Sequence, residues 1–285
     1  MNPASESGYR GRLAPSPTGY LHLGHARTFW VAQERALAHQ GVLVLRNDDL
    51  DVSRVRSEFV RSFIEDLRWL GCQWQEGPDV GGPLGPYSQH ERLNYYQEAF
   101  NQLRESGSLY PCQCSRKDIL ASIAAPHAND DEPVYPGTCR SLTQTHGKLS
   151  WRFRVPDGER IEFHDALAGP VSFIAGVDFG DFVVWRHDGV PSYQLACVVD
   201  DARMKISEVV RGSDLLVSTA RQLLLHRAMG WKAPKFCHCP LVRDAQGNRL
   251  AKRDESLSLR VLRQRGVSAE DVRNPGVDWM RWLDG

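Results

Sequence analysis

The sequence predicts an α/β protein built on a doubly wound parallel sheet, and three features of its 285 residues lead to this prediction. An apolar run, a loop rich in Pro and Gly, a helical pattern and a second apolar run follow one another, which is the order of a βαβ unit. Polar residues follow the predicted strands at their carboxyl ends, where ligands gather in such sheets. After residue 109 the composition changes, which predicts a small inserted subdomain.

Composition limits the class of protein. The chain is long enough for one or two domains, and its 35 basic and 35 acidic residues cancel, so a nucleic-acid partner would have to bind to local charged patches. The N-terminus lacks the apolar core of a signal peptide, and no apolar run is long enough to span a bilayer. We therefore expect a cytoplasmic protein with no membrane partner. The cysteines number seven, which favours reduced thiols or a bound metal over a disulfide framework.

The most informative stretch is residues 12–27, RLAPSPTGYLHLGHAR. Its loop leads into a helix, whose N-terminal N–H groups and dipole favour anions. His22 and His25 are three residues apart and can face one ligand from the first turn, and Gly24 lets a bound ring approach the backbone. A surface loop with two incidental histidines is the alternative. The stretch predicts a site that binds phosphate.

Regular patterns follow as far as residue 109. Apolar residues at helical spacing predict helices around 26–37, 59–70 and 93–103, with glycines soon after each. Residues 42–46 (VLVLR) read as a buried strand, and Asp48, Asp49 and Asp51 lie just beyond it. These carboxylates form a solvated loop, or Asp51 and Ser53 cap the next helix, or one carboxylate binds an ammonium group.

The excursion after residue 109 carries a candidate metal site. Cys112 and Cys114 are one residue apart, and Tyr135 and Cys139 follow across a loop rich in Gly and Pro. Such sulfur ligands suit tetrahedral zinc, with His127 as a rival for the fourth position and with free thiols and a surface tyrosine as the alternative. The segments SWRFRVP, RIEFHDAL and PVSFIAG then alternate at period two, which predicts antiparallel strands.

The chain then returns to the main sheet. Residues 195–199 (LACVV) predict a central strand, preceded by Tyr193, which reads by itself as a core tyrosine. Residues 206–210 predict another strand, and Arg211 at its end could bind a carboxylate or phosphate through two parallel hydrogen bonds or form a surface ion pair. Ser213 or Asp214 is expected to cap a helix over 216–228.

The last predicted strand covers residues 236–242. It contains Cys237, His238 and Cys239, and one metal could not easily collect all three, because consecutive strand residues alternate faces. The loop DAQGNRLAKRDES follows. It is either merely solvated or brings Lys252 to the phosphates of ATP.

Three segments together resemble the class I aminoacyl-tRNA synthetases: RLAPSPTGYLHLGH, then VVDDARMKISEVVRGSDLL with STARQ, then RLAKR, which is similar to the second class I signature. The RxAPSPTG lead-in resembles the glutamyl branch. More closely, the chain is similar to the glutamyl-queuosine tRNA(Asp) synthetases, paralogues of glutamyl-tRNA synthetase that lack the anticodon-binding domain. The chain stops where that domain is expected to begin.

The resemblance implies a Rossmann-type catalytic domain in two halves, 8–109 and 191–265, an inserted zinc-containing subdomain, 110–190, and a short tail, 266–285. It implies an enzyme that uses ATP with Mg²⁺ to activate L-glutamate and then transfers the glutamyl group to queuosine in tRNA(Asp). We also expect a monomer. The C-x-C and Y-x-x-x-C pattern implies one structural Zn²⁺ and favours Tyr135 over His127. The implied site residues are, for the glutamate side chain, Arg12, Tyr193 and Arg211; for its α-amino end, Ser16 and Asp48; for the adenylate, His22, Gly24 and His25; for the triphosphate, Lys252; and for zinc, Cys112, Cys114, Tyr135 and Cys139.

The chain departs from the family pattern in three places. RNDD stands where the family has RIED, so Asp48 is one methylene short of the usual glutamate and a water bridge to the ammonium group is an option. Ala251 replaces the serine before Lys252, and Cys237 and Cys239 have no role from the resemblance. The alternatives are a truncated glutamyl-tRNA synthetase that charges tRNA(Glu) and a synthetase-like regulator that binds tRNA without catalysis. The missing anticodon domain argues against the first, and the phosphate-binding residues argue against the second.

Overall fold

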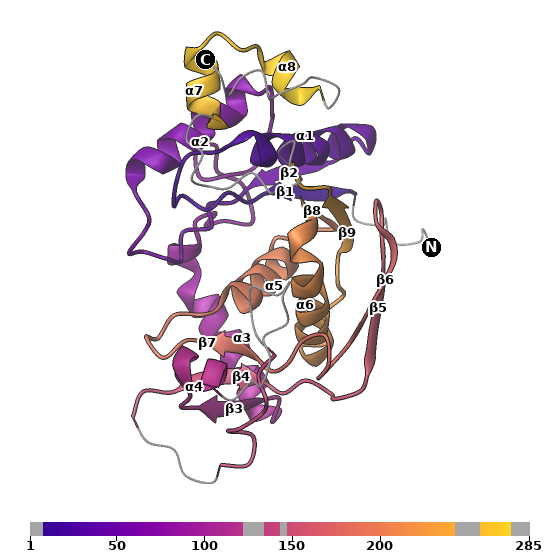
Figure 1. Ribbon diagram of the computed structural model, residues 1–285. Helices are drawn as coiled ribbons and strands as arrows, with labels where there is room; N and C mark the ends of the chain where they lie inside the picture. Colours follow the sequence, from indigo (N-terminus) through magenta and orange to yellow (C-terminus); the bar gives the residue numbers. More distant parts are fainter. Residues whose placement is uncertain (1–7, 122–133, 143–146, 243–256, 275–285) are drawn as a thin grey trace. The chain divides into compact units, whose positions relative to one another are not determined.

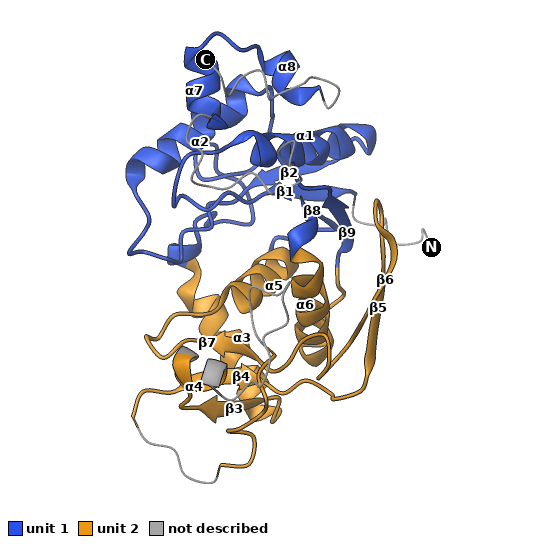
Figure 2. Ribbon diagram, in the orientation of Figure 1, with its two compact units in different colours: residues 1–91, 204–214, 234–285 blue, residues 92–203, 215–233 orange. Residues whose placement is uncertain are grey.

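The computed structural model describes residues 8–121, 134–142, 147–242 and 257–274 (Figure 1). They divide into two compact units, each assembled from separate stretches of the chain (Figure 2). Unit 1 comprises residues 1–91, 204–214 and 234–285, and unit 2 comprises residues 92–203 and 215–233. This division groups residues by contact. The domain limits at residues 109, 190 and 265 remain a prediction.

Unit 1 contains the parallel strands. Strand β1 (Arg10–Leu13) pairs in parallel with β2 (Val42–Leu45), and helix α1 (Leu23–Ala38) connects them, so the βαβ order is confirmed. Strand β8 (Glu208–Gly212) pairs in parallel with β9 (Lys235–Cys239). Helices α2 (Ser57–Trp69), α7 (Leu259–Gln264) and α8 (Ala269–Arg273) complete the unit. Three predicted site residues of this unit lie in its parallel strands or just after them. Arg12 is on β1, Asp48 follows β2, and Arg211 is on β8.

The core of unit 1 explains two cysteines that had no predicted role. Leucines of β1, β2 and α2 form its centre, and Cys237 and Cys239 of β9 are buried in the same cluster. Val210 of β8 is the register partner of Cys237 and belongs to the cluster too. A free cysteine behaves as a small apolar side chain, so these two serve packing.

Unit 2 holds the antiparallel strands. Strands β3 (Leu109–Cys112), β4 (Ser150–Phe153) and β7 (Phe182–Trp185) form one antiparallel sheet with β4 in the middle. Strands β5 (Arg160–Asp165) and β6 (Gly169–Ile174) form a hairpin. Helices α3 (Leu93–Glu105), α4 (Arg116–Ala121), α5 (Tyr193–Arg203) and α6 (Leu216–Ala228) belong to this unit. The α/β class and the antiparallel excursion are therefore confirmed.

The predicted central strand at residues 195–199 was wrong. These residues lie in the middle of α5, an 11-residue helix in which every residue from Leu195 to Asp201 is buried. A helix that is enclosed on all sides presents an unbroken apolar run, which by pattern alone is indistinguishable from a buried strand. Packing of α5 against α3, α6 and β7 supplies that enclosure.

The structure also excludes one alternative for a helix cap and shows that one predicted helix cap was wrong. Helix α2 begins at Ser57 with Arg56 in the N-cap position and no side-chain cap, so Asp51 and Ser53 do not cap it. The hydroxyl of Ser53 instead donates to Asp51 at 2.8 Å. Before α6, the short 3₁₀ turn Ser213–Leu215 intervenes, and Leu215 in the N-cap position makes no side-chain cap. In the described part of the chain no helix has both the length and the apolar character needed to cross a membrane.

The contact between α2 and α7 encloses an acid. Asp66 is fully buried, its Oδ2 accepts a hydrogen bond from Ser62, and its Oδ1 accepts none. Arg263 of α7 approaches Oδ1 only to 3.6 Å. Burial outweighs this arginine and raises the pKa of Asp66 to about 6.

We expect Asp66→Asn to stabilise the protein at neutral pH. The pKa of Asp66 is about 6 in the folded chain, whereas an aspartate in the unfolded chain has a pKa of about 3.9. The native state is therefore most stable below about pH 3.9 and loses stability as the pH rises through about 6. The substitution should remove that loss and add on the order of 1–2 kcal/mol above pH 6. Urea unfolding across the pH range measures it, with Glu58→Gln, at an exposed position of the same helix, as control. An equal gain at acidic pH would contradict the assignment.

Candidate functional site

The first candidate site is the loop that leads into α1. His22 is the N-cap of this helix, and its Nδ1 accepts a hydrogen bond from the Gly24 amide at 3.1 Å. In return, Nδ1 of His25 accepts from the His22 amide at 3.3 Å, and the two rings lie 3.8 Å apart between centroids. Since Nδ1 accepts in both neutral rings, each ring carries its proton on Nε2. Nε2 is therefore the hydrogen-bond donor of each ring.

Gly24 leaves room for the His22 ring beside the first turn of α1. A Cβ at position 24 would lie 3.0 Å from Cε1 of His22 and 3.2 Å from its Nδ1. In this structure the ring that comes close to the Gly24 backbone is therefore that of His22. An alanine here would require the His22 ring to shift by a few tenths of an ångström.

The segment after residue 256 is joined to the same loop. Ser258 caps α7 through its hydroxyl and forms a β-bridge with His22. The Leu259 amide donates to the Leu21 carbonyl at 2.7 Å, and Arg260 donates to the Tyr20 hydroxyl at 2.6 Å. Lys252 precedes Ser258 by six positions and lies outside the described residues. Residues 258–260 are thus anchored to the first signature.

Two buried arginines come from strands of unit 1. Arg12 lies on β1, and its Nη1 donates to the Val210 carbonyl of β8 at 2.8 Å. Arg211 follows Val210 on β8, and its Nε donates to Nε2 of His238 at 3.2 Å. Both arginines are 5% exposed. The structure therefore brings the predicted carboxylate ligands Arg12 and Arg211 to neighbouring positions on adjacent chain segments.

Asp48 has a partner that sequence reasoning missed. Nε of Arg46 donates to Oδ1 of Asp48 at 2.6 Å and Nη2 donates to Oδ2 at 3.2 Å, so the two groups meet as a fork. Arg46 is completely buried. The Asp48 amide also donates to the Pro15 carbonyl at 3.1 Å, which joins the end of β2 to the signature loop. The sequence did carry a signal for this pair. Arg46 and Asp48 are two positions apart, and in an extended chain this spacing places both side chains on one face.

Asp49, a second acid in this loop, is also held by contacts within the protein. Asp49 is buried and accepts hydrogen bonds from the His90 amide at 2.9 Å and from the side chain of Asn47 at 2.8 Å. The His90 ring nitrogen Nδ1 lies 2.6 Å from Oδ2 of Asp49. These contacts, which the sequence did not indicate, exclude a merely solvated acidic loop at Asp48 and Asp49.

The remaining predicted glutamate ligands are more exposed. Ser16 lies on the surface of the signature loop, where its carbonyl accepts a hydrogen bond from the Thr18 amide. Tyr193 is the first residue of α5 in unit 2 and is 43% exposed. The next residue, Gln194, donates to Ser218 at 3.1 Å and accepts from Gln222 at 3.0 Å, so α6 holds the first turn of α5.

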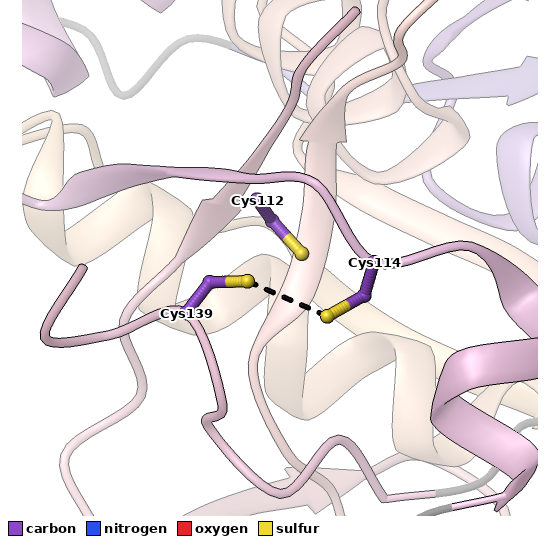
Figure 3. A group of neighbouring side chains, drawn as sticks. All are labelled: Cys112, Cys114 and Cys139. Carbon is purple, nitrogen blue, oxygen red and sulfur yellow. Dashed lines mark hydrogen bonds between the residues drawn. The ribbon is translucent and has the colours of Figure 1, made fainter. Parts of the chain in front are cut away.

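The second candidate site lies in unit 2 (Figure 3). The sulfur atoms of Cys112, Cys114 and Cys139 all lie within 4.8 Å of one another, and those of Cys114 and Cys139 are 3.4 Å apart. The Tyr135 hydroxyl oxygen lies 3.4 Å from the Cys112 sulfur and 3.5 Å from the Cys114 sulfur. The predicted ligand set therefore converges, although its members lie up to 27 positions apart in the sequence.

The chemistry of this cluster suits a soft cation. The group Cys112, Cys114 and Cys139 is the metal-compatible cluster found within the described residues, and it is mostly buried. Burial raises the pKa of the Cys114 thiol, so a thiolate there at neutral pH needs a neighbouring cation. Arg152 is a cation beside another member of the cluster: its Nε donates to the Cys112 sulfur at 3.3 Å, and its guanidinium carbon lies 4.0 Å from the centroid of the Tyr135 ring. His127, the rival ligand, lies outside the described residues.

Comparison with protein families and with individual proteins gives a consistent answer. A family described as "tRNA synthetases class I (E and Q), catalytic domain" matches residues 9–275. The chain is 50% identical over 271 residues to the glutamyl-Q tRNA(Asp) synthetase of Symbiobacterium thermophilum, covering 92% of this chain and 83% of that protein. With the protein of the same name from Nitratidesulfovibrio vulgaris the identity is 46% over the same shares.

Longer relatives match less closely. Glutamate–tRNA ligase 2 of Nitrosococcus oceani is 40% identical over 95% of this chain and 59% of its own length. The crystal structure of glutamate–tRNA synthetase from Elizabethkingia anophelis superposes with a TM-score of 0.76 at 30% identity, over 87% of this chain and 53% of that one. The chain thus spans about half the length of that structure. The predicted resemblance is confirmed, and the chain belongs to the class I aminoacyl-tRNA synthetases, a family of ligases, within the E and Q group of catalytic domains.

Proposed function

We propose that this protein uses ATP to activate L-glutamate and transfers the glutamyl group to queuosine at the wobble position of tRNA(Asp). The observation that carries the proposal is the higher identity to the two glutamyl-Q tRNA(Asp) synthetases, 50% and 46%, than to the glutamate–tRNA ligase of Nitrosococcus oceani, 40%. The geometry of unit 1 supports the activation step independently.

Glutamate recognition would rest on fixed cations. Arg12 and Arg211 are buried guanidinium groups on adjacent segments and are suited to a side-chain carboxylate, which they can hold by charge-assisted hydrogen bonds. An amide in place of the carboxylate would leave their charge without compensation, which would select glutamate over glutamine. Tyr193 would add a hydroxyl from α5. Ser16 and Asp48 would serve the α-amino end, with Arg46 holding the Asp48 carboxylate in position.

Activation would need no nucleophile from the protein. An oxygen of the glutamate α-carboxylate attacks the α-phosphorus of ATP, the bond to the β-phosphate oxygen breaks, and pyrophosphate leaves. The Nε2–H donors of His22 and His25 would stabilise charge on the phosphate oxygens, and Lys252 would bind the triphosphate. Mg²⁺ bound with ATP would neutralise further charge. Transfer follows when a hydroxyl of the queuosine ring attacks the activated carbonyl carbon, loses its proton and releases AMP.

The cluster in unit 2 would hold one structural zinc ion through Cys112, Cys114, Tyr135 and Cys139. Three sulfur donors and one oxygen complete a tetrahedral set, and zinc in such a site joins segments that contribute little core of their own. The ion would act on the folding of unit 2. We further propose that the protein works in the cytoplasm as a monomer.

Two measurements test the function in sequence. We expect exchange of labelled pyrophosphate into ATP that depends on glutamate and needs no tRNA. We then expect labelled glutamate to enter tRNA(Asp) that contains queuosine and ends in 2′,3′-dideoxyadenosine, because this tRNA has no acceptor hydroxyl at its terminus. The same tRNA without queuosine is the matched control.

The outcomes separate the candidates. Absence of glutamate-dependent exchange would exclude the enzymatic proposal. Exchange with labelling of ordinary tRNA(Glu), and none of the dideoxy-terminated tRNA(Asp), would identify a glutamyl-tRNA synthetase activity. Labelling of tRNA(Asp) that lacks queuosine would also contradict the proposed acceptor.

A further inference from the structure

His238 is a buried polar residue that the proposed function does not use. It is the fourth residue of β9, lies between two core cysteines and is 2% exposed. In the parallel pairing of β8 with β9 its register partner is Arg211. Its Nε2 accepts a hydrogen bond from the Arg211 Nε at 3.2 Å. A buried imidazole thus contacts a proposed glutamate ligand directly.

We infer that His238 is a positioning residue that fixes the guanidinium of Arg211 so that its Nη1–Nη2 edge meets the side-chain carboxylate of glutamate. This inference rests on the proposed function, since it assumes that Arg211 binds the substrate. It adds a residue that the resemblance did not assign and an orientation for the arginine.

The orientation follows from the shape of arginine. A guanidinium can hold a carboxylate in a fork through its Nε–Nη2 edge or through its Nη1–Nη2 edge. Nε of Arg211 already donates to His238, so the Nε–Nη2 edge cannot also bind a carboxylate in a fork. The glutamate carboxylate would then accept its two parallel hydrogen bonds from Nη1 and Nη2, at the end of the arginine side chain.

A second contact restrains the plane of the same group. The guanidinium carbon of Arg211 lies 5.6 Å from the centroid of the Phe236 ring, and Phe236 stacks in turn with His238 at 6.1 Å and 23°. Residues 236 and 238 share one face of β9 because side chains alternate along a strand. One hydrogen bond and one aromatic face together limit both the rotation and the tilt of the guanidinium.

The hydrogen bond also defines the state of the imidazole. Nε2 can accept from an arginine only when it carries no proton, so His238 is neutral with its proton on Nδ1. A side chain that keeps an acceptor at the same distance from the backbone should preserve the arrangement. Glutamine does so through its side-chain oxygen, whereas methionine has similar length and lacks a strong acceptor.

The test compares His238→Gln, His238→Met and the neighbouring core variant Cys237→Ala by glutamate-dependent pyrophosphate exchange. We expect His238→Met to raise KM for glutamate about 10–100-fold, because the charge-assisted hydrogen bond that orients Arg211 is lost. KM for ATP should stay within about twofold of the wild-type value. His238→Gln should retain KM for glutamate within about threefold, and Cys237→Ala should leave both KM values unchanged. Thermal unfolding of each variant reports folding.

The results distinguish the possible failures. If the wild-type protein shows no glutamate-dependent exchange, the proposed function fails and this inference with it. If the wild type is active and His238→Met keeps its KM for glutamate, only the positioning role is wrong. Equal losses in the Gln and Met variants, or parallel rises in both KM values, would assign His238 a packing role instead.

Discussion

Arg211→Lys is expected to lower kcat/KM for glutamate in pyrophosphate exchange about 100- to 1000-fold. Lysine keeps the positive charge but offers a single point of contact, so the fork to the carboxylate is lost. It also leaves His238 without its donor, in a setting where Arg211 is 5% exposed and water cannot easily replace the contact. Initial rates over a range of glutamate concentrations measure the effect.

The matched control is Arg160→Lys, which changes an arginine whose side chain is 64% exposed on β5. This control should leave both KM values unaltered. Discrimination is a second readout, because loss of the fork should narrow the preference for glutamate over glutamine. An Arg211→Lys enzyme with the wild-type KM for glutamate would remove Arg211 from the site.

Cys139→Ala is expected to abolish binding of the proposed zinc ion and to lower the unfolding temperature by more than about 10 °C. Structural zinc contributes folding free energy directly, and this cluster joins β3 to the segment that carries Tyr135 and Cys139. Elemental analysis of the purified protein should find about one zinc per chain in the wild type and far less in the variant. Chelation of the wild type should lower its unfolding temperature similarly.

Cys197→Ala provides the control for the loss of a buried sulfur. Cys197 lies in α5 of the same unit and is 1% exposed, so its truncation leaves a small cavity without touching the cluster. It should reduce stability modestly and keep the full zinc content. Stoichiometric zinc in Cys139→Ala, or unfolding that a chelator does not alter, would contradict the metal site.

Several features of the protein follow from the sequence because their causes are local. Helix periodicity around Phe63 and Phe100 needs only neighbouring residues, and α2 and α3 occupy the predicted regions. The signature residues His22 and His25 are three positions apart, so a single helical turn is enough to bring them together. The C-x-C pair likewise predicts two ligands on one short segment. Contiguous motifs of this kind were also sufficient to indicate the family.

The rest depended on contacts between distant residues. Leu195–Val199 became helical because other elements enclose them on all sides, a condition that an apolar run cannot express. His238 is 27 positions from Arg211, and only the register of β8 with β9 makes them partners. Tyr135 is 23 positions from Cys112, and only the tertiary structure brings its hydroxyl to that sulfur. The sequence by itself therefore determined the motifs and most of the helices and strands, whereas tertiary packing decided which buried polar group each motif meets, because burial and pairing depend on the whole fold.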